Sequence, residues 1–109
     1  MDREEYLESV TMNTGIKMNP VESSNIEGIG YDNKNKHLWV AFKGNKVYRY
    51  DLVPRKTFEE LMNAESKGRY LNSHIKGQYE ATNILFFRFP FWELLFWDSL
   101  LPTPIVPGG

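Results

Sequence analysis

The chain has 109 residues, of which 41% are hydrophobic and 25% charged, with a net charge of −1 and no cysteine. This length and composition predict one globular domain with appended segments, and they exclude a disulfide framework and thiol chemistry. The lack of cysteine and the acidic, signal-free N-terminus favour a cytoplasmic protein.

The small net charge conceals a segregation of charge along the chain. Residues 34–76 carry ten basic and four acidic residues, whereas residues 1–33 carry seven acidic and two basic ones. A basic centre between acidic flanks is the electrostatic pattern of a nucleic-acid-binding protein. The alternative is that these lysines only keep turns and helix faces soluble.

The first predicted element is a short helix over residues 2–12. It begins at a suitable N-cap, Asp2, and acidic residues in its first turn complement the helix dipole. Gly15 lies just after the predicted end, where a helix commonly stops. The apolar face of this helix carries Tyr6, Leu7 and Val10.

Three strands are predicted next, over residues 25–32, 37–42 and 46–52, and polar turns join them. Two glycines in the first strand indicate a bulge or a close backbone approach. Alternation in the second strand places Leu38, Val40 and Phe42 on one face and His37, Trp39 and Ala41 on the other. In the third strand, Tyr48, Tyr50 and Leu52 share a face, opposite Val47, Arg49 and Asp51.

Two short helices follow the strands. Pro54 opens the first, which Gly68 is expected to close, and the second runs over residues 69–77. Their inward residues are Phe58, Leu61, Met62, Tyr70, Leu71 and Ile75. The sequence therefore predicts an α+β fold, with a three-stranded antiparallel meander and two short helices packed on one face. An N-terminal helix and an apolar C-terminal extension complete it.

The centre of the chain carries a series of short motifs in a fixed order. They are V-x-S-S-x-I from Val21, I-G-Y-D from Ile29, Y-x-Y from Tyr48, V-P at 53–54 and S-x-G-x-Y-x-N-x-x-I from Ser66. Together they resemble the KTSC domain, a small domain found at the C-terminus of some lysyl-tRNA synthetases and as stand-alone bacterial and phage proteins. The resemblance implies a suggested RNA-binding role and no established activity. It covers residues 18–79, leaving residues 1–17 as an acidic helix and linker and residues 80–109 as an apolar extension.

Six residues of the basic centre are candidates for contact with nucleic acid. Trp39 is the candidate stacking ring, because the alignment of Tyr48 and Tyr50 with Leu52 favours core packing for the tyrosine face. The alternative interpretation of Trp39 is a half-buried hairpin residue without a ligand, and the alternative for the basic residues is that they are solvated surface charges. The candidate phosphate contacts are Lys43, Lys46, Arg49, Arg69 and Lys76.

No arrangement typical of an enzyme or a metal site is present in the sequence. Ser23 and Ser24 lack the G-x-S-x-G context of a nucleophile, so we expect their hydroxyls to stabilise a turn or the start of a strand. His37 and His74 lack the spacing of metal ligands. We therefore predict a non-catalytic binding module with no cofactor and no metal.

Residues 84–101 form a strongly apolar segment that holds seven of the aromatic residues. It is too short and too charged for an ordinary membrane-spanning helix, and it lacks the basic face of a membrane-surface helix. An apolar helix of this kind must be buried on most sides. We therefore expect contact with a protein partner or a second copy of the chain, which makes an interaction adaptor or inhibitor the alternative function. The expected interface residues are Phe91, Trp92, Leu95, Phe96 and Trp97.

Overall fold

The computed structural model describes residues 2–84. Its helices are α1 (Arg3–Thr14), α2 (Arg55–Asn63), α3 (Lys67–Tyr70) and the π-helical turn η1 (Leu71–Ile75), and its strands are β1 (Asn19–Pro20), β2 (Ile26–Asp32), β3 (His37–Phe42), β4 (Lys46–Tyr50) and β5 (Ala81–Ile84). The strands form one antiparallel sheet in the order β1-β2-β3-β4-β5. The α+β class is confirmed. The predicted meander is the centre of this sheet, which β1 and β5 extend to five strands.

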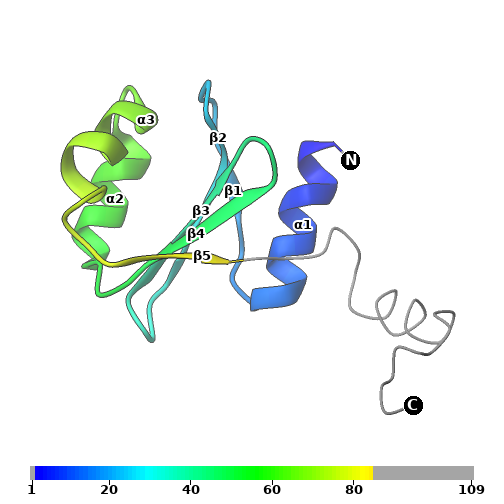
Figure 1. The fold of residues 1–109 in the computed structure, drawn as a ribbon, viewed down its shortest axis with the longest axis horizontal. Coiled ribbons are helices and arrows are strands. Elements are labelled where there is room, and N and C mark those ends of the chain that lie inside the picture. The colour runs from blue at the N-terminus through cyan, green and yellow to red at the C-terminus, as the bar shows by residue number, and fades with distance from the viewer. Residues whose placement is uncertain (1, 85–109) are drawn as a thin grey trace, which may run out of the picture.

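The sheet is covered on both faces, by α2 and α3 on one side and by α1 on the other (Figure 1). Each face holds its own hydrophobic core. Beneath α2 and α3 lie Leu38, Val40 and Tyr50, whereas Trp39, Ala41 and Val47 lie beneath α1. The alternation predicted for β3 and β4 is therefore confirmed up to Tyr50.

Helix α1 is closely joined to the β3–β4 hairpin. Asp2 caps the first turn, and Gly15 ends the helix with a left-handed φ of 77°. The Tyr6 hydroxyl donates to the carbonyl oxygens of Phe42 at 3.0 Å and Lys46 at 3.3 Å. Burial raises the pKa of this hydroxyl well above its usual value. Helix α1 thus holds the two residues that flank the hairpin turn, from the face of the sheet opposite α2 and α3.

Strand β4 ends at Tyr50, two residues before its predicted end. Leu52 takes a left-handed φ of 57° and is 74% exposed, so it does not extend the tyrosine face into the core. The chain must turn here from the sheet to α2, and the fully buried Val53 takes the next inward position. Alternation alone cannot reveal this turn, because Leu52 has the polarity of a core residue.

Helix α2 ends at Asn63, so the prediction that Gly68 closes it is wrong. Ala64 is extended, and the Ser66 hydroxyl accepts a hydrogen bond at 3.3 Å from the backbone N–H of Arg69, which begins a new helix. Gly68 therefore lies inside α3. Residues 63–69, NAESKGR, contain no large apolar residue, so apolar periodicity could not locate the end of α2 within them.

Strand β5 comes from the segment that the sequence assigned to the C-terminal extension. It pairs with β4, with Tyr50 opposite Ala81 and Val47 opposite Ile84. Ile84 packs against the core beneath α1. Four mostly exposed residues show too little alternation to predict a strand. Among residues 2–84, no helix is long and apolar enough to cross a membrane.

Candidate functional site

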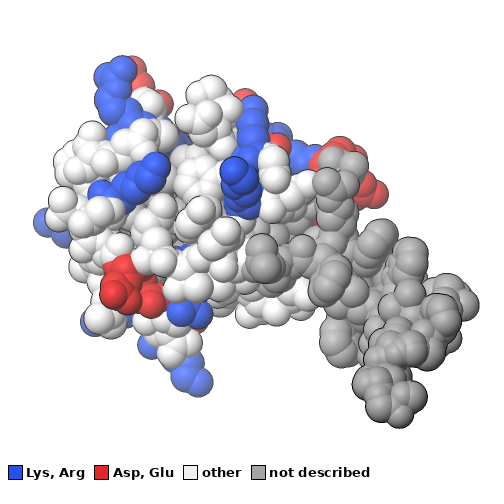
Figure 2. Space-filling view, in the orientation of Figure 1, with Lys and Arg blue, Asp and Glu red and all other residues white. Residues whose placement is uncertain are grey.

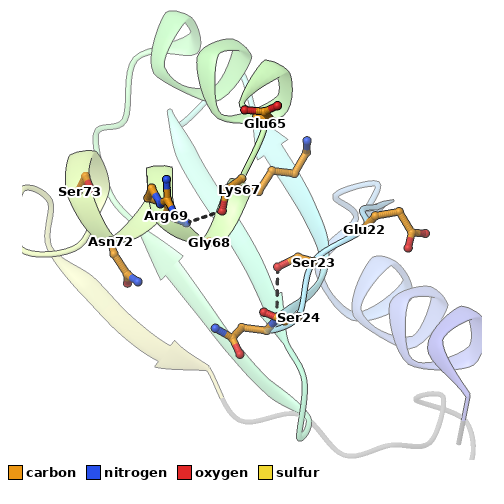
Figure 3. Close-up of a pocket in the computed structure, with 11 residues that line it drawn as sticks. Glu22, Ser23, Ser24, Glu65, Lys67, Gly68, Arg69, Asn72 and Ser73 are labelled. Atoms are coloured by element: carbon orange, nitrogen blue, oxygen red, sulfur yellow. Dashed lines mark hydrogen bonds between the residues drawn. The ribbon is translucent and has the colours of Figure 1, made fainter.

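Two adjoining hollows lie against the helical segment α3–η1, one facing the loop of residues 22–25 before β2 and the other facing the β-sheet. The serine hollow has a volume of about 440 Å³ and is lined by Ser23, Ser24, Ser66 and Ser73 (Figure 3). The aromatic hollow has a volume of about 490 Å³ and is lined by Phe42, Tyr48 and Tyr50. Asn25 and Asn72 line both hollows, so the two meet at these residues.

The aromatic hollow has a one-sided charge. Lys43 and Lys46 reach it from the β3–β4 hairpin and Lys76 from the end of η1, and no acidic residue among residues 2–84 lines it. Within the same residues, none of the three ammonium groups has a salt-bridge partner. Basic side chains stand on both sides of an uncharged strip between helices and sheet (Figure 2). This hollow is therefore suited to an anionic ligand.

Aromatic rings form the wall of the aromatic hollow. Tyr50 is only 2% exposed and belongs to the core, but Tyr48 and Phe42 are half-buried. Tyr48 meets Phe42 edge to face, with ring centroids 5.6 Å apart, and stacks on Tyr50 at 6.5 Å. A tyrosine held from two sides in this way is a pre-oriented surface on which a flat ligand can stack.

The hairpin that carries two of the lysines is held in place by its own turn and by a neighbouring loop. Gly44 and Asn45 take φ values of 87° and 62°, the left-handed conformations that tight hairpins require. The backbone N–H of Lys43 donates to the carbonyl oxygen of Asn25 at 2.8 Å. The hairpin is therefore tied to the loop that lines both hollows.

The serine hollow is polar and balanced in charge. Glu22 and Glu65 line it together with Lys67 and Arg69, and the Lys67 ammonium donates to a backbone carbonyl oxygen at 3.0 Å. The Ser23 hydroxyl accepts from two backbone N–H groups of its own turn, each at 3.2 Å, which confirms the predicted turn role. Among the described residues, no histidine lines either hollow, so neither offers these serines an imidazole base.

Trp39 is the main correction to the predicted site. Its ring is 8% exposed and lies in the core beneath α1, so it cannot offer a face to a ligand. The prediction treated the Trp39 face of the sheet as open, whereas α1 covers it. Tyr48 and Phe42 are the ring residues that sequence reasoning missed. The signal for Tyr48 was the Y-x-Y motif, which was interpreted as core, and alternation in β3 had placed Phe42 on the same predicted core face as Leu38 and Val40.

Arg49 also lies away from the hollows, on the α1 side of the sheet. Its guanidinium is 2.8 Å from the Asp51 carboxylate, which also lies 3.5 Å from the His37 imidazole. The six predicted residues therefore separate into three groups. Lys43, Lys46 and Lys76 meet in the aromatic hollow, Arg69 lines the serine hollow, and Trp39 and Arg49 lie elsewhere.

Tyr70, next to Arg69, is directed toward α2. Its hydroxyl donates to the Glu60 carboxylate at 2.7 Å, and its ring stacks on His74 at 4.3 Å. Desolvation, together with the hydrogen bond to Glu60, raises the pKa of Tyr70 to about 12. The segment α3–η1 and its end thus contribute Arg69 and Lys76 to the hollows, while Tyr70 joins α3 to α2.

A profile of the KTSC domain matches residues 22–79, more than half of the chain. The chain belongs to the KTSC domain family. A protein of Tsukamurella paurometabola is 44% identical over 64 residues, which are 59% of this chain and 96% of that protein. The crystal structure of a KTSC domain protein from Yersinia pestis is similar to this fold with a TM-score of 0.63 and 37% identity, covering 64% of this chain and 99% of that one.

The same domain is similar to part of a much larger protein. The lysine–tRNA ligase of Nostoc punctiforme is 39% identical over 59 residues, which are 54% of this chain but 10% of the ligase. Helix α1 and strand β5 lie outside the KTSC match, whereas nearly the whole lining of both hollows lies inside it. The hollows therefore belong to the KTSC domain itself.

The predicted partner interface, Phe91, Trp92, Leu95, Phe96 and Trp97, lies outside the described residues. Within residues 2–84, no group of three or more histidine, aspartate or glutamate side chains is placed to hold a metal ion.

Proposed function

We propose that this KTSC protein is a non-catalytic module that binds single-stranded nucleic acid, with RNA as the first-choice ligand, in the aromatic hollow. The observation that carries the proposal is the meeting of Lys43, Lys46 and Lys76, without an acidic neighbour among the described residues, around the half-buried Tyr48 ring. The domain is similar to part of a lysine–tRNA ligase, an enzyme named for a tRNA substrate, and this similarity supports RNA as the ligand.

Each part of the hollow has a distinct role in this proposal. The lysines attract phosphates, and this attraction weakens as salt rises because binding releases condensed counterions. Tyr48 supplies a stacking face, and Phe42 holds its ring from the side. Arg69 lines the adjoining serine hollow, where it can contact a nucleotide of the same RNA strand next to the one that stacks on Tyr48.

Replacing Lys43, Lys46 and Lys76 with alanine should weaken binding of a single-stranded RNA by about tenfold or more at low salt. The plot of log affinity against log salt should also become shallower by about 2, since each phosphate contact contributes about 0.7 on a single strand. Fluorescence anisotropy at several salt concentrations measures both effects.

The matched control removes the same charge elsewhere. Lys17, Lys34 and Lys56 are exposed, line neither hollow and have no salt bridge among the described residues. Their triple alanine variant should lose much less affinity and keep most of the salt slope. If both triple variants lose affinity equally, the attraction comes from overall charge, and the aromatic hollow is not the binding site.

The adaptor hypothesis places function in the C-terminal segment and makes a different prediction. A chain that ends after Ile84 keeps β5 and should bind RNA with unchanged affinity, because both hollows remain. If residues 84–101 drive self-association, the full chain elutes as a dimer in size-exclusion chromatography with light scattering and the shortened chain as a monomer. Loss of RNA affinity in the shortened chain would contradict the proposal.

A further inference from the structure

The two hollows meet at a pair of carboxamides that come from opposite walls. Asn25 lies in the loop before β2, and Asn72 lies in η1. Both side chains are exposed, and each lines both hollows. The Asn72 side chain points from the helical segment toward the strands of the sheet (Figure 3). Any nucleic-acid strand that extends from one hollow into the other must therefore pass between these two side chains.

Both asparagines are held by their backbone while their side chains remain available. The backbone N–H of Asn25 donates to the Ser23 hydroxyl at 3.2 Å, and its carbonyl oxygen accepts from Lys43. Asn72 follows the buried Leu71, and a π-type hydrogen bond of 2.8 Å joins Lys76 back to Leu71 around it. Among residues 2–84, neither carboxamide has a hydrogen-bond partner. Single π-turns of this kind occur frequently at functional sites.

The charges of the two hollows indicate which part of a nucleotide each hollow can bind. The aromatic hollow is basic and suited to phosphates, whereas the serine hollow has two acids and two bases and offers no net attraction. A carboxamide presents a donor and an acceptor side by side, and the edge of a base can satisfy both, whereas a phosphate can only accept from the donor. Adenine, with an adjacent amino donor and ring-nitrogen acceptor, is the base that asparagine pairs with most directly.

We infer that Asn25 and Asn72 read the edge of a base at the junction of the two hollows and give this protein a preference for adenine. This inference rests on the proposed function and deepens it, because the lysines supply affinity regardless of sequence and the asparagines supply selectivity. The adjacent nucleotide stacks on Tyr48, and its phosphate lies among the lysines.

The test compares twelve-nucleotide oligo(A), oligo(U) and oligo(C) RNA by fluorescence anisotropy at one salt concentration. Wild-type protein should bind oligo(A) most tightly. Because adenine also stacks well, the decisive quantity is the ratio of the oligo(A) and oligo(U) affinities in wild type and in the Asn25→Ala/Asn72→Ala variant. That ratio should fall by about tenfold in the variant, while the salt slope for oligo(U) stays unchanged.

Asn63→Ala is the control, since Asn63 is an exposed asparagine at the end of α2 that lines neither hollow. It should leave the ratio unchanged. An equal ratio in wild type and the double variant would overturn base reading while leaving the proposed function standing. If no oligonucleotide binds even at low salt, the proposed function fails and the inference fails with it. A circular dichroism spectrum identical to wild type establishes that the double variant is folded.

Discussion

Replacing Trp39 with alanine should lower the free energy of unfolding by about 3–5 kcal/mol. The ring is 8% exposed and lies with Val47 and Ala41 beneath α1, so its removal leaves a cavity between helix and sheet. This is a large share of the stability of a small domain. Reversible urea denaturation, followed by circular dichroism, measures the change.

Further variants test whether Trp39 is a core residue or a ring that binds the ligand. Trp39→Phe keeps a ring in the core, so the folded variant should bind RNA with wild-type affinity. Tyr48→Ala should weaken binding by about tenfold, because one base loses its stacking surface. A Trp39→Ala variant that stays as stable as wild type but loses RNA affinity would reverse this assignment and make Trp39 the ligand-binding ring.

Replacing Gly30 with alanine should destabilise the fold by about 3 kcal/mol. A Cβ atom there would lie 2.6 Å from the backbone oxygen of Lys17 and 2.8 Å from the sulfur of Met18. Backbone cannot rotate away as a side chain can, so the segment after α1 would have to move off β2. Urea denaturation of the full chain gives the change in unfolding free energy.

Two other glycines provide graded controls for this effect. At Gly28 an added Cβ would lie 2.6 Å from the end of the Leu7 side chain, which can shift, and 3.1 Å from the backbone oxygen of Asn19, a milder backbone contact than at Gly30, so alanine should cost about 1–2 kcal/mol. At Gly68, inside α3, the nearest atom is 3.8 Å away, and alanine should be neutral or stabilising by up to about 1 kcal/mol. A Gly30→Ala variant no less stable than Gly68→Ala would mean that the segment after α1 is not held against β2.

The sequence by itself determined the elements whose signals are local. Alternation placed Leu38 and Trp39 on opposite faces of β3, because successive side chains on a strand point to opposite sides. Gly15 and Asp2 marked the ends of α1, since caps act within one helical turn. The glycines of β2 indicated a bulge or close approach, and the structure shows a register shift between Ile26 and Gly28.

The tertiary structure alone decided which faces are open and which side chains meet. A period of two shows that Trp39 and Tyr48 point to opposite sides, but coverage depends on where α1 docks, and α1 is distant along the chain. Lys76 joins Lys43 and Lys46 only because α3 and η1 fold back over the sheet. Local patterns carry no information on such long-range contacts, so the sequence could name most of the cations but not the hollow that brings three of them together.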